Sequence, residues 1–412
     1  MSIAMKMFEH AGPVRLFDEE VAHHDRRTEY IPFGMPNYSE EEIQAVANVL
    51  RSGWVGMGQQ TIKFEQELAA TVKAPYVSTV NSCTSALFLS LLLHGVGEGD
   101  EVIVPSLTWC STANAALYLG ATPVFCDIDP KTFCVSVESI LAKVTSKTKV
   151  VTVVHYGGYA VDVEELRRQL PRRIAIVEDA AHAMGSFYET GMPVGSSGNL
   201  TCFSFYANKN LSTGDGGAIA LFDEEKNEQL RSLRQHAMNA NAWNRFVNPK
   251  SILYSMIENL GYKMNYTDLH ASIGRVQLRR QPDFNRVRNR IGDYYYEHLK
   301  MLQPEITFQR NVTSRSHAKH LFAIVLPTEK MSITRDEFVL KMREQNIGVS
   351  IHYYPLHKMP LYQYKGSPLT VTEEVAGSII TLPISARMTM ADAEYVVDNF
   401  KEIFVHHYVN PF

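Results

Sequence analysis

Apolar residues recur along this chain in short runs separated by stretches of helical length. From about Val72 onward, four such runs are rich in β-branched residues: EVIVP (101–105), TPVFCDI (122–128), KVVTVV (149–154) and IAIVED (174–179). Continuous apolar strands of this kind are typical of a parallel sheet covered on both faces. The pattern therefore predicts an α/β fold, in which ligands gather at the carboxyl ends of the strands.

Helix signals precede this alternation. Ser39 and Glu42 have the spacing of a capping box ahead of IQAVANVL, and Gly53 supplies a stop. Residues 1–30 show little periodicity, so we expect an N-terminal arm there.

The second half of the chain changes pattern. A strand-like AIALF (218–222) is followed by helical segments from Thr267 to about Tyr296. From about His317 come strand-like HLFAIVL, a helix over 335–345, and a last helix that begins with a Thr389/Asp392 capping box. We predict a large α/β domain over 31–295 and a small C-terminal α+β domain over 296–412.

Composition narrows the class of protein. A chain of 412 residues can bury a large core, and its net charge of −4 gives no polycationic face for nucleic acid or anionic lipid. Five scattered cysteines without a C-x-x-C pair predict reduced thiols, and no apolar run reaches membrane-spanning length. We expect a cytoplasmic protein that binds neither nucleic acid nor membrane.

Polar residues follow several of the predicted strands. NSCTSAL (81–87) is a small-residue turn into an apolar helix, suited to cradle a phosphate, although a plain helix cap explains it equally well. Trp109 follows EVIVP and could stack on a planar ring, but most tryptophans are core or interface anchors.

Two further strand ends carry charge. Asp179 ends IAIVED, and a buried acid there needs a cation, either a structural arginine or a protonated ring nitrogen. Lys209 lies in SFYANKN (204–210), just before the glycines of GDGG (214–217). A phosphate cradle, an aromatic plate, a carboxylate and a lysine at one sheet edge together match the needs of pyridoxal 5′-phosphate (PLP).

The chain resembles the DegT/DnrJ/EryC1/StrS sugar aminotransferases from about Pro32 to its C-terminus. The resemblance rests on SFYANKN with GDGG, EDAAHA, PSLTW, a GY-x-x-N segment at Asn265, and HYYPLH from His352. Several motifs in the family's order are far more specific than any one alone. The resemblance implies the PLP-dependent transferase fold of type I, with a mainly parallel mixed sheet and a small α+β domain.

The resemblance also implies roles for single residues. Lys209 would be the internal aldimine lysine and proton shuttle, Asp179 would hold the pyridinium, and Trp109 would stack on the ring. The backbone amides of Cys83 and Thr84 and the hydroxyl of Ser204 would bind the phosphate. His182 would lie beside the ring oxygen. Asn265 would reach the cofactor of a neighbouring subunit, which implies a homodimer with composite sites. The chain departs from the common pattern at Cys83, where many members have glycine. It departs again in GYKMN, where many members read GYNYR. Lys263 is therefore the alternative to Asn265 for the contact with the phosphate of the neighbouring subunit's cofactor.

The expected reaction is transamination, because the family's dehydratase branch has histidine in place of Lys209. L-glutamate would donate the amino group to a keto-sugar, by resemblance a nucleotide-linked 4-keto sugar for surface polysaccharide. Two alternatives concern the acceptor, which could be a keto-inositol or a free keto-sugar acid. A third alternative is that the protein is a non-catalytic PLP-binding regulator. His352 and His357 either contact the acceptor or are structural, and no third ligand suggests a metal. Arg234 and Arg245 either contribute to the acceptor pocket of the neighbouring subunit or are surface charges.

Overall fold

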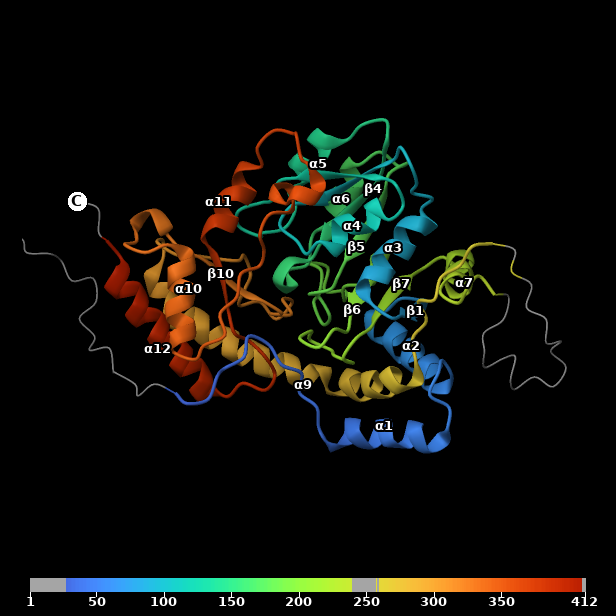
Figure 1. The fold of residues 1–412 in the computed structure, drawn as a ribbon, viewed down its shortest axis with the longest axis horizontal. Coiled ribbons are helices and arrows are strands. Elements are labelled where there is room, and N and C mark those ends of the chain that lie inside the picture. Colours follow the sequence, from blue (N-terminus) through green and yellow to red (C-terminus); the bar gives the residue numbers. More distant parts are fainter. Residues whose placement is uncertain (1–26, 239–256, 258, 410–412) are drawn as a thin grey trace, which may run out of the picture.

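The computed structural model describes residues 27–238, 257 and 259–409. A seven-stranded sheet lies at its centre in the order β1-β7-β6-β5-β4-β2-β3 (Figure 1). The strands from β3 to β6 run parallel, and β7 is antiparallel to both β6 and β1. The strand bounds are β1 (Tyr76–Val80), β2 (Glu101–Pro105), β3 (Thr122–Cys126), β4 (Thr148–Val154), β5 (Ala175–Asp179), β6 (Leu200–Ser204) and β7 (Gly217–Leu221).

Helices cover both faces of this sheet, because alternate side chains of each strand point to opposite faces. In β5, Val177 packs into the cluster with α3, α4 and α7, whereas Ile176 packs into the cluster with α5 and α6. Near β1, β6 and β7 the second face is covered by α2 and α9. The helix bounds are α1 (Glu40–Ser52), α2 (Gln59–Val72), α3 (Cys83–Leu93), α4 (Ser111–Leu117), α5 (Val137–Lys143), α6 (Val163–Gln169), α7 (Glu224–Leu233) and α9 (Asp268–Leu299).

A second, three-stranded antiparallel sheet in the order β10-β9-β8 supports the C-terminal part of the chain. Its hydrophobic cluster includes Tyr295 of α9, Phe338 of α10 and Phe400 of α12. Helix α9 runs from beneath the large sheet to these helices, so it contributes to the cores of both sheets (Figure 1). The bounds are β8 (Thr307–Phe308), β9 (Phe322–Val325), β10 (Ile379–Leu382), α10 (Arg335–Glu344), α11 (Thr370–Ser378) and α12 (Met390–His407).

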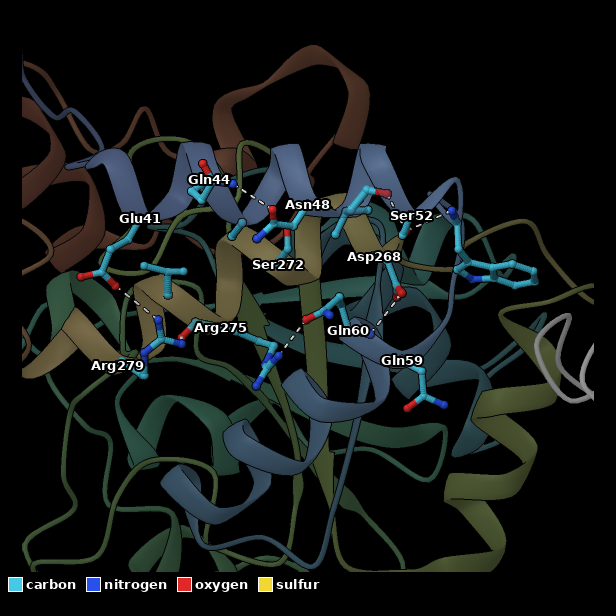
Figure 2. A pocket seen from close by; sticks show the side chains of 14 residues that line it. Glu41, Gln44, Asn48, Ser52, Gln59, Gln60, Asp268, Ser272, Arg275 and Arg279 are labelled. Atoms are coloured by element: carbon cyan, nitrogen blue, oxygen red, sulfur yellow. Dashed lines mark hydrogen bonds and ion pairs between the residues drawn. The ribbon is translucent and has the colours of Figure 1, made fainter.

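Helix α1 lies along α9 with a polar groove between them (Figure 2). Glu41 of α1 pairs with Arg279 of α9 at 3.3 Å, and the carboxylate of Asp268 accepts hydrogen bonds from the N-terminus of α2. The predicted capping box of Ser39 and Glu42 is present, and Gly53 ends α1 in a left-handed conformation with φ of 73°. Both boundary predictions for α1 are confirmed.

Most other predicted elements are confirmed with boundary shifts of one or two residues. The Thr389/Asp392 capping box at the start of α12 is present. Helix α2 and strands β8 and β10 were not predicted. The two strands have two and four residues, too few for a periodic signal, whereas α2 buries Phe64, Leu68 and Val72 at helical spacing that the prediction missed. Most of the predicted arm, residues 1–26, lies outside the described residues. Ile31, the first residue after the arm, forms a parallel bridge with Ile347 and packs into the C-terminal cluster.

The two-domain division stays a prediction. Leu356 and Leu369 pack into the core of the large sheet, as do Val375 and Ala376 on its opposite face. Part of the segment assigned to the small domain therefore contacts the large one. In the described part of the chain, no helix is long and apolar enough to cross a membrane.

Candidate active site

A cavity of about 510 Å³ opens at the carboxyl ends of β4, β5 and β6, beside the N-terminus of α3. This is where a doubly wound sheet is expected to bind a ligand. Its lining includes Lys209, Asp179, Trp109, His182, Ser204, Cys83, Thr84, His352 and Tyr353. The structure thus brings together side chains that the sequence spreads over 271 positions, from 83 to 353 inclusive.

The N-terminus of α3 forms one wall. Ser82 caps the helix, with its hydroxyl accepting from Ser85 N at 3.1 Å and its carbonyl accepting from Ala86 N at 3.1 Å. The amides of Cys83 and Thr84 come before these bonds, among the first helical N–H groups that have no intrahelical partner. They can donate to an anion where the helix dipole also favours negative charge.

Glycine allows β7 to approach this helix start closely. A Cβ on Gly217 would lie 2.6 Å from the carbonyl carbon of Ser82 and 2.7 Å from Cys83 N. At Gly216, φ is 146° and a Cβ would lie 2.6 Å from the Tyr266 ring. The last two glycines of GDGG are therefore required by space around the candidate phosphate cradle.

Asp179 is buried at the end of β5. One carboxylate oxygen accepts from Thr112 Oγ1 at 2.8 Å, and the other accepts from Ala181 N at 3.1 Å. Burial raises the pKa of this carboxyl, because no salt bridge to it is formed within the described residues. A cationic ring nitrogen in the cavity would supply the missing countercharge.

Lys209 follows β6 and lies half-buried in the same cavity. Burial lowers its pKa from 10.5 to about 8, although the nearby Cys83 and Asp179 oppose that shift. About a tenth of such an amine is neutral at pH 7. The chain therefore holds a nucleophilic amine close to neutral pH.

His182 and Tyr353 are joined across the cavity. Gly157 N donates to His182 Nδ1 at 3.3 Å, so the ring proton is on Nε2, which lies 3.0 Å from the Tyr353 hydroxyl oxygen. The Tyr353 hydroxyl oxygen accepts a hydrogen bond from this N–H group, so its own O–H can donate to another acceptor. Burial holds the pKa of His182 well below its usual range, which keeps the ring neutral.

Trp109 lies just beyond β2 at the cavity mouth, with 61% of its surface exposed. Its ring centre lies 6.1 Å from that of Tyr353, at an interplanar angle of 50°. A core anchor would be buried, so this exposure contradicts the core alternative and fits either a ligand-facing or an interface side chain.

The two candidate histidines of the HYYPLH segment have different surroundings. His352 lines the cavity, with Nδ1 3.0 Å from Thr381 Oγ1, and burial lowers its pKa to about 3. His357 lies outside the cavity lining, and its ring nitrogens contact Ser106 Oγ at 2.7 Å and Glu373 at 3.1 Å. These contacts favour the structural alternative for His357.

Three basic or amide candidates lie away from the cavity lining. Asn265 forms a bridge with Val80 at the end of β1, and Lys263 is exposed. Arg234 is not a surface charge, since it is buried and pairs with Glu65 at 2.6 Å. Arg245 lies outside the described residues.

Several lining residues were missed by sequence reasoning. Tyr353 is adjacent to a predicted histidine, and Asp215 lies within the quoted GDGG. Their motifs could have suggested them. His320 lies outside the cavity lining but contacts Lys209 from 111 positions away in the sequence. It follows no recognisable motif, so no sequence signal pointed to it.

The donor set fits PLP on observations of this structure alone. It offers orphan helix amides for a phosphate, a buried carboxyl without a cation for a ring nitrogen, and a lysine with a lowered pKa for an aldehyde. The carboxamide oxygen of Asn208, which lines the cavity, also lacks a hydrogen-bond partner within the described residues.

Comparisons with known proteins agree with this fit. Residues 36–401 match the model of the DegT/DnrJ/EryC1/StrS aminotransferase family. The chain is 38% identical over 384 residues to the spore coat polysaccharide biosynthesis protein SpsC of Bacillus subtilis, covering 92% of this chain and 98% of SpsC.

Solved structures give the same result. The putative sugar aminotransferase Spr1654 from Streptococcus pneumoniae, in its PMP form, has a TM-score of 0.83 and 31% identity, over 90% of this chain and 98% of Spr1654. Its PLP form has a TM-score of 0.82 and 30% identity, over 91% and 98%. The aminotransferase TlmJ from Streptoalloteichus hindustanus has a TM-score of 0.83 and 32% identity, over 91% and 99%.

Proposed function

The chain belongs to the DegT/DnrJ/EryC1/StrS aminotransferase family, and we propose on that basis that it transfers an amino group from L-glutamate to a keto-sugar. The acceptor we propose is a nucleotide-linked 4-keto sugar used for surface polysaccharide. The names of SpsC and Spr1654 support a sugar acceptor and a polysaccharide product. The family membership and the PLP form of Spr1654 make PLP the cofactor.

One observation carries the proposal: Lys209, Asp179, Trp109 and the N-terminus of α3 surround a single cavity. We assign phosphate binding to the amides of Cys83 and Thr84 and to the Ser204 hydroxyl. Asp179 would hold the ring nitrogen protonated, and Trp109 would cover one ring face. When bound, PLP supplies an aldehyde for amine exchange and a ring that withdraws electrons from the reacting carbon.

Lys209 performs the proton transfers in this proposal. Its Nζ removes a proton from the amino donor and later returns one to the acceptor, steps that each contribute roughly 10²–10⁴-fold. The lowered pKa of about 8 suits this work, since a group that both takes and gives protons is most effective near the working pH. His182 and Tyr353, both neutral, orient an oxygen of the bound ligand without adding charge.

The proposal includes a homodimer and the two-domain division given above. Asn265 lies beside the end of β1, outside the lining of its own cavity, which is compatible with a contact to a neighbouring cofactor. Lys263 is the alternative donor for that contact, because its side chain is exposed.

The test is an absorbance spectrum of the PLP-loaded protein before and after L-glutamate is added. We expect the lysine-bound cofactor band to convert to the spectrum of the aminated cofactor. Lys209→Ala should lack the lysine-bound band, and Lys365→Ala, which removes an exposed lysine, should behave as wild type. A wild-type protein without a cofactor band would contradict the proposal.

The acceptor is tested separately with the aminated protein. Nucleotide-linked 4-keto sugars should restore the original spectrum, and keto-inositols or free keto-sugar acids should not. Recovery with either of the latter would replace the proposed acceptor. Failure with every acceptor, despite a complete reaction with glutamate, would favour a PLP-binding regulator.

A further inference from the structure

A chain of hydrogen bonds leads from the backbone to the amine of Lys209. Asn210 Nδ2 donates to the carbonyl oxygen of Ala318 at 2.8 Å. Asn210 Oδ1 lies 3.1 Å from His320 Nδ1, and His320 Nε2 lies 3.4 Å from Lys209 Nζ. Two short segments, 209–210 and 318–320, therefore meet at the amine.

The hydrogen bond from Asn210 to Ala318 determines which atoms donate in the other two hydrogen bonds. A carbonyl oxygen can only accept, so the nitrogen of the Asn210 carboxamide must face Ala318. The Asn210 oxygen then faces His320 Nδ1, which must carry the ring proton. His320 Nε2 is left with a lone pair, and that lone pair faces Lys209 Nζ.

The tautomer of His320 decides what the lysine can do. If Nε2 carried the proton, it would donate to the lone pair of the neutral amine and occupy the electrons that must attack an aldehyde. With the proton on Nδ1, Nε2 accepts an N–H of the amine instead, and the amine lone pair is free to face the cavity.

We propose that His320, held in its Nδ1-protonated tautomer by Asn210, is a positioning residue that keeps the Lys209 lone pair directed into the cavity. The inference rests on the proposed role of Lys209 as the cofactor-binding lysine. It also gives a physical reason for the asparagine that directly follows that lysine in SFYANKN.

The surroundings keep His320 neutral. Its side chain is 3% exposed, and its ring centre lies 4.5 Å from that of His182. Burial, and then the positive charges of Lys209 and Arg288, hold the pKa of His320 well below its usual range; the neighbouring His182 and His352 act in the same direction. A doubly protonated ring, which would donate to the amine, is thereby disfavoured.

The test measures how fast the cofactor-free full-length chain captures added PLP, as a function of pH. Capture forms one C=N bond between Lys209 Nζ and the aldehyde carbon and releases one water, and the bound form is followed by its absorbance. Asn210→Leu, which frees the tautomer, should lower the capture rate at pH 8 by roughly ten-fold. Asn227→Leu is the matched control, since Asn227 is also buried and bonds Ser78 Oγ at 2.9 Å.

The pH profile separates positioning from a loss of structure. In Asn210→Leu, a proton on Nε2 stabilises the neutral amine, so the midpoint of the profile should move below that of wild type. Local loosening would instead hydrate Lys209 and move the midpoint up towards 10.5, and that result would overturn the inference.

A second pair of variants tests whether Lys209 needs a hydrogen-bond acceptor at the position of His320 Nε2. The carboxamide oxygen of His320→Gln can replace Nε2 as the acceptor, whereas His320→Leu has none. We expect His320→Gln to keep most of the capture rate and His320→Leu to lose it. Equal rates of PLP capture in the two variants would contradict a role for His320 Nε2 as a hydrogen-bond acceptor.

A last measurement needs no substitution. ¹⁵N NMR of the histidine-labelled cofactor-free protein should show His320 protonated at Nδ1, and protonation at Nε2 would overturn the inference. If wild type itself captures no PLP at Lys209, the proposed function fails. If wild type and Asn210→Leu capture it equally, only this inference fails.

Discussion

Lys209 and Asp179 are both shifted towards their neutral forms in the cofactor-free chain. Burial lowers the pKa of the lysine and raises that of the carboxyl, and the charge of each only partly opposes the shift of the other. A cavity that disfavours isolated charge stabilises a ligand that brings a matching charge. These two residues therefore prepare the site for a ligand with a cationic ring and an electrophilic carbon.

The lowered pKa of Lys209 predicts a pH-dependent effect on stability. Below pH 8 the lysine is protonated in both states, and the folded state carries the full cost of burying the charge. As pH rises from about 8 to 10.5, the folded lysine is neutral while the unfolded lysine still binds a proton, so stability increases with pH. Lys209→Met should therefore stabilise the cofactor-free chain below pH 8, by roughly 1–3 kcal/mol.

Urea denaturation at several pH values checks this prediction. The gain from Lys209→Met should shrink above pH 8 and disappear near 10.5. Lys263→Met removes an exposed lysine and should show neither effect. A gain of constant size at every pH would mean that the charge of Lys209 is not the cause.

At the level of elements, α9 organises the helices beneath the large sheet. Asp268 at its first position accepts from Gly58 N at 2.8 Å, Gln60 N at 3.1 Å and Thr61 N at 2.9 Å, and from Thr61 Oγ1 at 2.7 Å. Gly58, the N-cap of α2, has no side chain to do this. A carboxylate from another helix therefore satisfies the start of α2 (Figure 2).

We expect Asp268→Ala to lower the free energy of unfolding by roughly 2–4 kcal/mol, because several buried donors lose their acceptor. Asp268→Asn keeps one carboxamide oxygen and should lose less. Asp283→Ala is the control on the same helix, since Asp283 is exposed and pairs with the exposed Arg286. Denaturant unfolding measures all three, and equal losses for Asp268→Ala and Asp283→Ala would contradict the capping role.

For the whole molecule, the cavity is where distant parts of the chain meet. Its walls come from the large sheet, the turn before α3 and the 352–353 segment, while His357 holds the following turn to Ser106. A ligand that bridges these walls should stabilise the entire folded chain, because it binds the folded state and not the unfolded one.

Added PLP should therefore raise the unfolding temperature of the cofactor-free protein. Saturation to 100 times Kd contributes about 2.7 kcal/mol, which corresponds to a shift of a few degrees for a chain of this size. Asp179→Asn removes the countercharge for the ring nitrogen and should reduce the shift. Asp129→Asn, in a turn outside the cavity lining, should keep the full shift in unfolding temperature. An undiminished shift in Asp179→Asn would mean that Asp179 does not contact the cofactor.

The sequence by itself determined the local features of this protein. Apolar β-branched runs specified β2, β4 and β5, because such strands are buried on both faces of a parallel sheet. The run at β3 was also recognised, although β3 lies at the sheet edge and is buried only at Phe125 and Cys126. Capping residues specified the starts of α1 and α12, since a helix end must satisfy its own amides. The motifs around Lys209 and Asp179 indicated the cofactor, because its chemistry demands those residue types.

Only the tertiary structure decided which distant side chains act together. It separated His352 from His357, buried Arg234 against Glu65, and brought Tyr353 to the cavity and His320 to the amine of Lys209. None of these contacts has a characteristic spacing. Lys209 and His320 are 111 positions apart, and Leu321 and Ala323, next to His320, pack against residues of the large sheet. Local propensity acts over a few residues, whereas pKa shifts, tautomers and cavity walls depend on neighbours that folding alone supplies.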